Sequence, residues 1–204
     1  MTDRILENGK PTASLADNLI SAEVYLGAEP IAQALAAGAQ IVVTGRVADP
    51  SIFMAPMMHE FGWDPMDAAR LGQGMGIGHL MECGAQVTGG YFSDPGFKDV
   101  PDLAHLGFPL AEVQADGTAV ITKLSDTGGC VTVATCTEQL LYELEDPARY
   151  LQPDVTADFT QVKLTPAGPD RVHVSGGRGA PRPELLKVTV GYRDGYMADG
   201  QISY

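Results

Sequence analysis

Three side chains capable of proton transfer or metal binding occur close together near the middle of the sequence. His79, Glu82 and Cys83 have the spacing i, i+3 and i+4, which places them on one face if the segment is helical. A histidine beside a glutamate can form an acid/base pair, and all three side chains could ligate a metal. A metal site would also need His59, and no HExxH or CxxC motif is present. We therefore predict catalytic roles for His79 and Glu82 and assign no metal ligand, while a structural role for His79 stays open.

The turn TGRVADPS at residues 44–51 is a second candidate, because it joins an expected strand to an expected helix. Arg46 and the backbone N–H groups around Gly45 and Ser51 could bind an anionic substrate. Asp49 could cap the helix or accept a substrate hydroxyl, and we count it with the catalytic residues. The alternative is a salt bridge between Arg46 and Asp49 that only stabilises the turn.

The third candidate is the segment from Lys123 to Gly129, where an expected strand ends and an expected helix begins. Thr127, Gly128 and Gly129 would let a ligand approach the backbone, and Lys123 would add a positive charge. A carboxylate or the phosphates of a CoA carrier would suit this site. The alternative is a tight turn that needs glycine for its backbone shape. The Gly-Lys-Ser/Thr of a P-loop is absent, which argues against a nucleoside triphosphate.

The elements that would position these residues begin at Leu19. Residues 19–27 are strand-like, residues 29–38 form an Ala-rich helical pattern, and the β-branched run 39–47 is typical of a buried strand. This order predicts a β-α-β unit with parallel strands, whose carboxyl edge would present residues 44–49. A helix is then expected from Asp49, with proline at its first turn, and HLMECGAQVTGG is expected to form a separate short helix.

Alternating patterns dominate the second half of the chain. The runs PLAEVQ and AVITK, joined by Asp116-Gly117, predict a β-hairpin. The segment SDTGGCVTVATCTEQLLYELEDP predicts a helix that ends at Glu145. Antiparallel strands are expected in TQVKLTPAGPDRVHVSGG and in LLKVTVGYRDGYMADGQISY. The expected fold class is α/β, with a parallel β-α-β unit followed by an antiparallel, strand-rich α+β portion.

Composition limits the partners that the protein can bind. The 204 residues are 45% hydrophobic, enough for a sizeable core, and 13 Lys plus Arg against 26 Asp plus Glu leave a formal net charge of −13. Such a charge opposes binding to nucleic acid and to acidic membrane surfaces, but a local cationic site could still hold a small anionic substrate. Three cysteines without a CxxC pair fit a reducing compartment. Without a signal-peptide pattern or a long apolar run, a cytoplasmic location is expected.

Six blocks of sequence together resemble one known family: EVYLGAEPIAQALAAGAQIVVTGRVADPS, HEFGW, GHLMECGAQVTGGYF, DVPDLAHLGFPLAEV, ITKLSDTGGCVTVATCTEQLLYELEDPARYLQPDV and DRVHVSGGRG. The chain is similar, from about Leu19 to its last residue, to the AtuA-like proteins of the acyclic terpene utilisation family. The resemblance implies a part in bacterial catabolism of citronellol or geraniol, a route through acyl-CoA intermediates. It implies no catalytic residues, so the site assignments depend on the patterns above.

The resemblance also predicts how the chain is organised. Family members look longer at both ends, so residues 1–18 are expected to be a polar arm or the remnant of a preceding segment. Residues 19–204 would then be an AtuA-like α/β domain that is incomplete at its strand-like GQISY end. We expect either a hydratase, dehydratase or lyase that acts on a branched acid or its CoA thioester, or a non-catalytic assembly or regulatory subunit. A homo-oligomer, or association with a chain that supplies the missing family portions, is expected in both cases.

Overall fold

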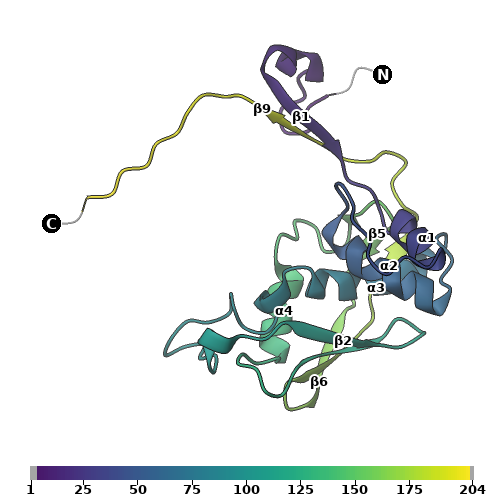
Figure 1. Cartoon of the computed structure of the whole chain (residues 1–204), viewed down its shortest axis with the longest axis vertical. Helices are drawn as coiled ribbons and strands as arrows, with labels where there is room; N and C mark the ends of the chain where they lie inside the picture. The colour runs from purple at the N-terminus through teal and green to yellow at the C-terminus, as the bar shows by residue number, and fades with distance from the viewer. Residues whose placement is uncertain (1–3, 203–204) are drawn as a thin grey trace.

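A mixed body of helices and sheets carries a projecting two-stranded ribbon in the computed structural model, which describes residues 4–202 (Figure 1). The helical elements are η1 (Thr12–Asn18), α1 (Glu29–Ala36), α2 (Asp49–Phe61), α3 (Ala68–Met81), η2 (Gly84–Gln86), η3 (Leu103–His105) and α4 (Val133–Leu141). The strands are β1 (Leu19–Val24), β2 (Pro109–Val113), β3 (Ala119–Lys123), β4 (Tyr150–Leu151), β5 (Thr156–Asp158), β6 (Lys163–Gly168), β7 (Arg171–Ser175), β8 (Arg178–Ala180) and β9 (Val188–Tyr192).

Helix α3 lies at the centre of the body, and every residue from Leu71 to Met81 is buried. Its glycines explain how neighbours approach so closely. A Cβ on Gly78 would collide with the Pro50 carbonyl of α2, and one on Gly72 would collide with the Arg178 carbonyl of β8. The glycine-rich stretch is therefore a packing surface for a helix on one side and a strand on the other.

All strand pairs in the described sheets are antiparallel. One sheet has the order β2-β3-β7-β6, a second has the order β4-β5-β8, and β1 pairs with β9 in the ribbon. The mixed fold class is confirmed, as are the hairpin β2-β3 and the antiparallel strands β6 and β7. Helix α2 begins at Asp49 with Pro50 in its first turn, as predicted.

The predicted β-α-β unit needed two parallel strands on either side of α1. The structure shows a single parallel bridge there, between Leu26 and Val47. Residues 39–46 form no strand, and β1 pairs with β9 instead. The reason is that β1 leaves the body within the ribbon, so the β-branched run finds no strand beside it. Its side chains at Ile41 and Val43 stay 84% and 91% exposed.

Three boundaries also differ from the sequence prediction. The short helix expected from His79 is instead the end of α3, which runs from Ala68 without a break, followed by the single turn η2. Helix α4 ends at Leu141 rather than Glu145, because Tyr142 is already extended and Glu143 then adopts a left-handed backbone conformation. Residues 193–202 form no strand, and the rest of the predicted GQISY strand, Ser203 and Tyr204, lies outside the described residues.

Within residues 4–202, none of the helices has both the length and the hydropathy needed to cross a membrane.

Candidate functional site

Helix α3 carries His79 in its last turn and ends at Met81, and Glu82 is its C-cap residue. Nδ1 of His79 lies 2.9 Å from Oε1 of Glu82, although the angle falls short of a directed hydrogen bond. The side chain of His79 is fully buried and that of Glu82 is 8% exposed. The i, i+3 spacing thus brings the two predicted catalytic residues into contact.

Several buried polar atoms around this pair have no hydrogen-bond partner among the described residues: His79 Nδ1 and Nε2, Glu82 Oε2 and Gln139 Oε1. Unpartnered polar atoms cost free energy when they are buried, and proteins retain few of them. Among the described residues, the buried side-chain atoms without a hydrogen-bond partner thus all belong to this one cluster of three residues.

Burial raises the pKa of the Glu82 carboxyl, and the contact with His79 opposes that rise. The negative charges of Asp49 and Glu143 add to the rise. A carboxyl group with a raised pKa can be both an effective base and an effective acid closer to neutral pH. Glu82 is therefore a buried carboxyl group with a raised pKa, and the catalytic role expected for it and for His79 stays a prediction.

Glu82 forms part of the wall of an open cavity of about 430 Å³. The other residues that line this Glu82 cavity are Phe53, Met81, Cys83, Gly84, Phe108 and Pro109. Apolar side chains dominate the wall, and neither lysine nor arginine is among these lining residues. The cavity thus offers an apolar surface to a ligand and one titratable carboxyl group.

Three further side chains complete the surroundings of the pair. Gln139 of α4 donates from Nε2 to the backbone carbonyl of His79 at 2.9 Å. Burial raises the pKa of the Cys83 thiol, and Gln139 opposes that rise. The rings of Tyr150 and Phe159 lie 5.3 and 5.8 Å from the His79 ring. Burial, and then the charge of Glu82, raise the pKa of the Tyr150 hydroxyl.

Sequence reasoning missed Gln139, Tyr150 and Phe159 as neighbours of the site. They come from α4, β4 and the segment after β5, and no spacing in the sequence links these elements to α3. Only the fold brings them to His79.

His59, which a metal site at His79 would also need, does not lie beside His79. His59 is exposed near the end of α2, whereas His79 is fully buried. Over residues 4–202 no group of three or more His, Cys, Asp or Glu side chains is placed to hold a metal ion.

Arg46 and Gly45 lie at a different surface, the ribbon groove. This groove of about 570 Å³ is lined by Glu23, Val24, Leu26, Pro30, Ile31, Ala34 and residues 42–47. Nε of Arg46 donates to Glu23 at 2.7 Å, and its guanidinium lies over the ring of Tyr25. The alternative prediction was a salt bridge between Arg46 and Asp49. Arg46 is paired with Glu23 instead, although the charge of Asp49 also raises the pKa of Arg46 slightly.

Ser51 is fully buried, and its hydroxyl donates to the carboxylate of Asp154 at 2.5 Å. The same carboxylate accepts the N–H of Ala28 at 2.8 Å, so it joins the starts of α1 and α2. Burial raises the pKa of Asp154, and these two hydrogen bonds oppose the rise. In this arrangement the hydroxyl of Ser51 stabilises the packing of two helices and is not exposed to a substrate.

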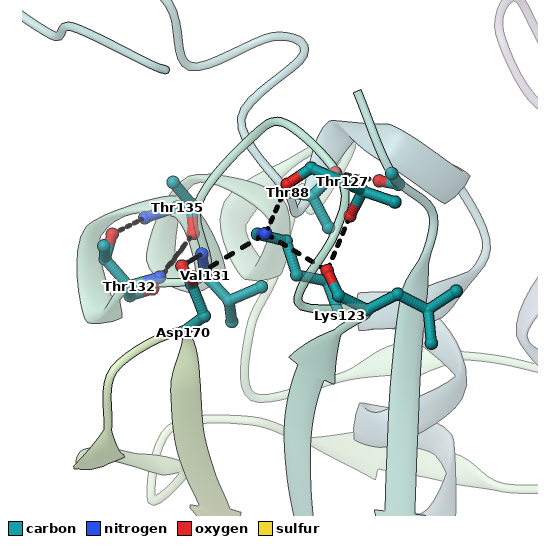
Figure 2. Close-up of polar contacts among 9 residues, drawn as sticks. Thr88, Lys123, Thr127, Val131, Thr132, Thr135 and Asp170 are labelled. Carbon is teal, nitrogen blue, oxygen red and sulfur yellow. Dashed lines mark hydrogen bonds and ion pairs between the residues drawn. The ribbon is translucent and has the colours of Figure 1, made fainter. Parts of the chain in front are cut away.

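Lys123 ends β3, and Thr127 lies beside it in the turn that follows, where their polar groups are used within the chain (Figure 2). Gly128 and Gly129 come next in this turn. Nζ of Lys123 donates to the Thr127 carbonyl at 2.8 Å and lies 3.7 Å from Asp170. Asp170 accepts the N–H of Val131 just before α4. The lysine thus links the turn to the start of the helix and has only 4% of its side chain exposed.

The backbone N–H groups of this turn also have partners. Gly128 donates to the carbonyl of His105, and Gly129 donates to that of Pro101. The Thr127 hydroxyl donates to Leu124 at 2.7 Å. In this conformation these groups are not free to bind an anion, which favours the tight-turn alternative.

The structure therefore divides the predicted site residues into separate places. His79 contacts Glu82 behind the Glu82 cavity, and Asp49 acts on Glu82 only through its negative charge. Arg46 and Gly45 lie at the ribbon groove. Ser51 binds Asp154, and the turn after Lys123 forms a closed network. Within the described residues no hydrogen bond or ion pair connects that network to His79 or Glu82.

Comparison with known proteins gave a single kind of match. The family model described as "Acyclic terpene utilisation family protein AtuA" matches residues 1–204. Neither the curated proteins nor the solved structures contain a significant match to this chain.

Proposed function

Because this chain belongs to the AtuA family of acyclic terpene utilisation proteins, we propose that it acts on a branched acyl group, with Glu82 as the group that transfers the proton. The substrate would be a branched carboxylic acid or its CoA thioester, and the reaction a hydration, dehydration or lyase step. CoA would serve as the carrier of the substrate.

The observation that carries this proposal is the position of the Glu82 carboxyl group. It has a raised pKa, contacts a buried histidine, and forms part of the wall of an apolar cavity. Apolar walls suit a methyl-branched hydrocarbon chain. A desolvated carboxylate is also a stronger base than one in water, because burial disfavours its charge.

One carboxyl group can catalyse a dehydration without a cofactor. As the carboxylate, Glu82 takes the proton from the carbon next to the acyl carbonyl, and a carbon–carbon double bond begins to form. The resulting carboxylic acid gives that proton to the departing β-hydroxyl group, which leaves as water. The C–H and C–O bonds break, one double bond forms, and Glu82 returns to its starting state. Hydration is the reverse.

His79 would act as a positioning residue in this scheme. It is fully buried and touches Glu82, so it contacts the acid/base group rather than the substrate. Burial is the main cause of the raised pKa of Glu82, and the negative charge of Asp49 would add to that rise. Arg46 could hold the anionic end of a substrate only by exchanging its present partner Glu23.

The test is a mass-spectrometric assay of the purified chain with methyl-branched 3-hydroxyacyl-CoA and 2-enoyl-CoA thioesters, which detects the loss or gain of one water. We expect Glu82→Gln to lower the rate by about 10²- to 10⁴-fold, the usual contribution of a general acid or base. The matched control is Glu60→Gln, at an exposed position on α2, which should leave the rate unchanged. Equal rates for Glu82→Gln and the unmodified chain would overturn the proposal.

A non-catalytic assembly or regulatory subunit is the second candidate function. The polar groups around Lys123 bond to one another and are not free to hold a substrate, which favours this role. The exposed apolar ribbon favours it as well, because it offers a surface to another chain. A folded protein that turns over none of these thioesters, with or without a second chain, would favour this role. For both roles we propose a cytoplasmic location and association with a further copy or another chain.

A further inference from the structure

Residues 40–45 have the composition of a strand but lack the pairing of one. Within the described chain, none of their backbone N–H or C=O groups makes a hydrogen bond. The segment contains the run Ile41-Val42-Val43, whose β-branched side chains favour strands. Ile41 and Val43 point away from the core and are almost fully exposed. Such a segment is a template for pairing with another chain.

Strand β1, next to this segment, has an open edge as well. It pairs with β9 on one side, and over Leu19–Val24 its other edge makes no backbone hydrogen bond in the described structure. All six of its residues are exposed, including Ile20 at 68%. A two-stranded ribbon is marginally stable in water on its own, and Figure 1 shows this one projecting from the body. A further strand would both extend and cover it.

The ribbon groove between β1 and α1 is apolar and electrically balanced. Glu23 and Arg46 are the charged residues among those that line it, and they pair with each other at 2.7 Å. The whole chain carries a formal net charge of −13, so two copies repel each other over most of their surface. This neutral apolar face is a place where a second copy can approach without that repulsion.

We propose that the open edge of β1, together with Ile41 and Val43, is the interface of a two-fold homodimer. β1 of one copy pairs antiparallel with β1 of the second, which extends the two ribbons into a four-stranded sheet. Ile41 and Val43 of each copy pack against the ribbon of the other. A second copy is the occupant because an edge strand related to itself by a two-fold axis meets its own antiparallel complement, and the arrangement closes.

Sedimentation velocity of the full chain tests the proposal, with concentration varied. We expect a monomer–dimer equilibrium in the unmodified chain. Ile20→Asp and Val43→Asp should each raise the dimer dissociation constant by about tenfold or more, because they place an unpaired charge in an apolar contact. Phe97→Asp is the matched control: it adds the same charge at another exposed apolar residue, 88% exposed, next to Lys98, which pairs with Glu138 of α4, and should leave the constant unchanged.

Hydrogen exchange distinguishes strand pairing from simple side-chain contact. In the dimer, backbone amides of Leu19–Val24 should exchange more slowly than in the Val43→Asp variant at the same concentration. A chain that stays monomeric at all concentrations would overturn the proposal, and so would a dimer that survives both Asp variants. Open-ended polymers, or a dimer without added protection in β1, would also contradict a closed β1–β1 interface.

Discussion

The buried histidine in α3 contacts Glu82 and does not line the Glu82 cavity itself. Its ring is enclosed by Tyr150 and Phe159 and is not accessible to a molecule in the Glu82 cavity. Its contact with Glu82 lowers a carboxyl pKa that burial has raised. The two effects oppose each other, so the protonation of Glu82 depends on how well His79 is held in place.

We expect His79→Leu to raise the pKa of Glu82 further, because leucine fills a similar volume but lacks the imidazole whose contact with Glu82 opposes the rise. The carboxylate is the form that removes a proton from carbon, so the rate should rise with pH through the Glu82 pKa. Loss of the histidine should therefore move this rise to higher pH. The measurement is a ¹³C NMR titration of the Glu82 carboxyl group, which needs no substrate, together with the pH–rate profile.

His59→Leu provides the control for this substitution. His59 is exposed near the end of α2, so its replacement should leave the Glu82 titration where it is. A Glu82 titration that stays in place or moves to lower pH in His79→Leu would show that the histidine does not stabilise the carboxylate.

At this scale the sequence predicts contacts within one helix but not between elements. The i, i+3 spacing was enough to place His79 beside Glu82. It said nothing of Asp154 as the partner of Ser51, because 103 positions separate them and only the fold brings them together. Arg46 was assigned by chemistry to an anion, yet it is paired with Glu23 across the ribbon groove.

Among the elements, the turn between β3 and α4 is held by close approach of backbone to backbone. Gly128 leaves no room for a side chain against the Asp102 carbonyl, and a Cβ on Gly129 would lie 2.5 Å from the Thr88 carbonyl oxygen. Gly129 also has a φ of +86°, which side chains disfavour. The two glycines therefore have a packing role that requires no ligand.

Gly129→Ala and Gly96→Ala together separate this packing from backbone strain. Gly96 has a nearly identical φ of +87°, but nothing lies within 4 Å of its added Cβ. We expect Gly96→Ala to cost about 1 kcal/mol from the backbone alone. Gly129→Ala should cost about 1–3 kcal/mol more, because Thr88 and Leu106 must move. Urea unfolding of both variants measures the difference, and equal losses would mean that the turn is not tightly packed.

Local patterns predicted those elements whose neighbours in the sequence are also their neighbours in space. The hairpin β2-β3 formed as expected because Asp116-Gly117 brings its two strands together directly. The run 39–47 had an equally clear strand pattern, but its pairing needed β1 to lie beside it. β1 pairs instead with β9, more than 160 positions along the chain. Patterns within a segment do not reveal that competition.

Across the whole molecule, charge and apolar exposure are separated. The 26 acidic side chains outnumber the basic ones two to one, while the ribbon and residues 40–45 expose isoleucine, leucine and valine with a single balanced ion pair. Repulsion between copies is therefore general, whereas the attraction that we propose is local and apolar. Added salt screens the repulsion and leaves the apolar attraction, so it should favour this interface. An interface held by ion pairs would instead be weakened by salt.

Added sodium chloride should strengthen the dimer for this reason. Raising the ionic strength from about 0.05 to about 0.5 M shortens the Debye length severalfold, so the repulsion between two copies of charge −13 weakens while apolar contacts persist. We expect the dissociation constant, measured by sedimentation, to fall as salt rises. Val43→Asp should respond in the same direction from a weaker starting point, since each copy then adds one negative charge to the interface and the dimer gains two. Dissociation of the unmodified dimer by salt would instead mean that ion pairs hold the copies together.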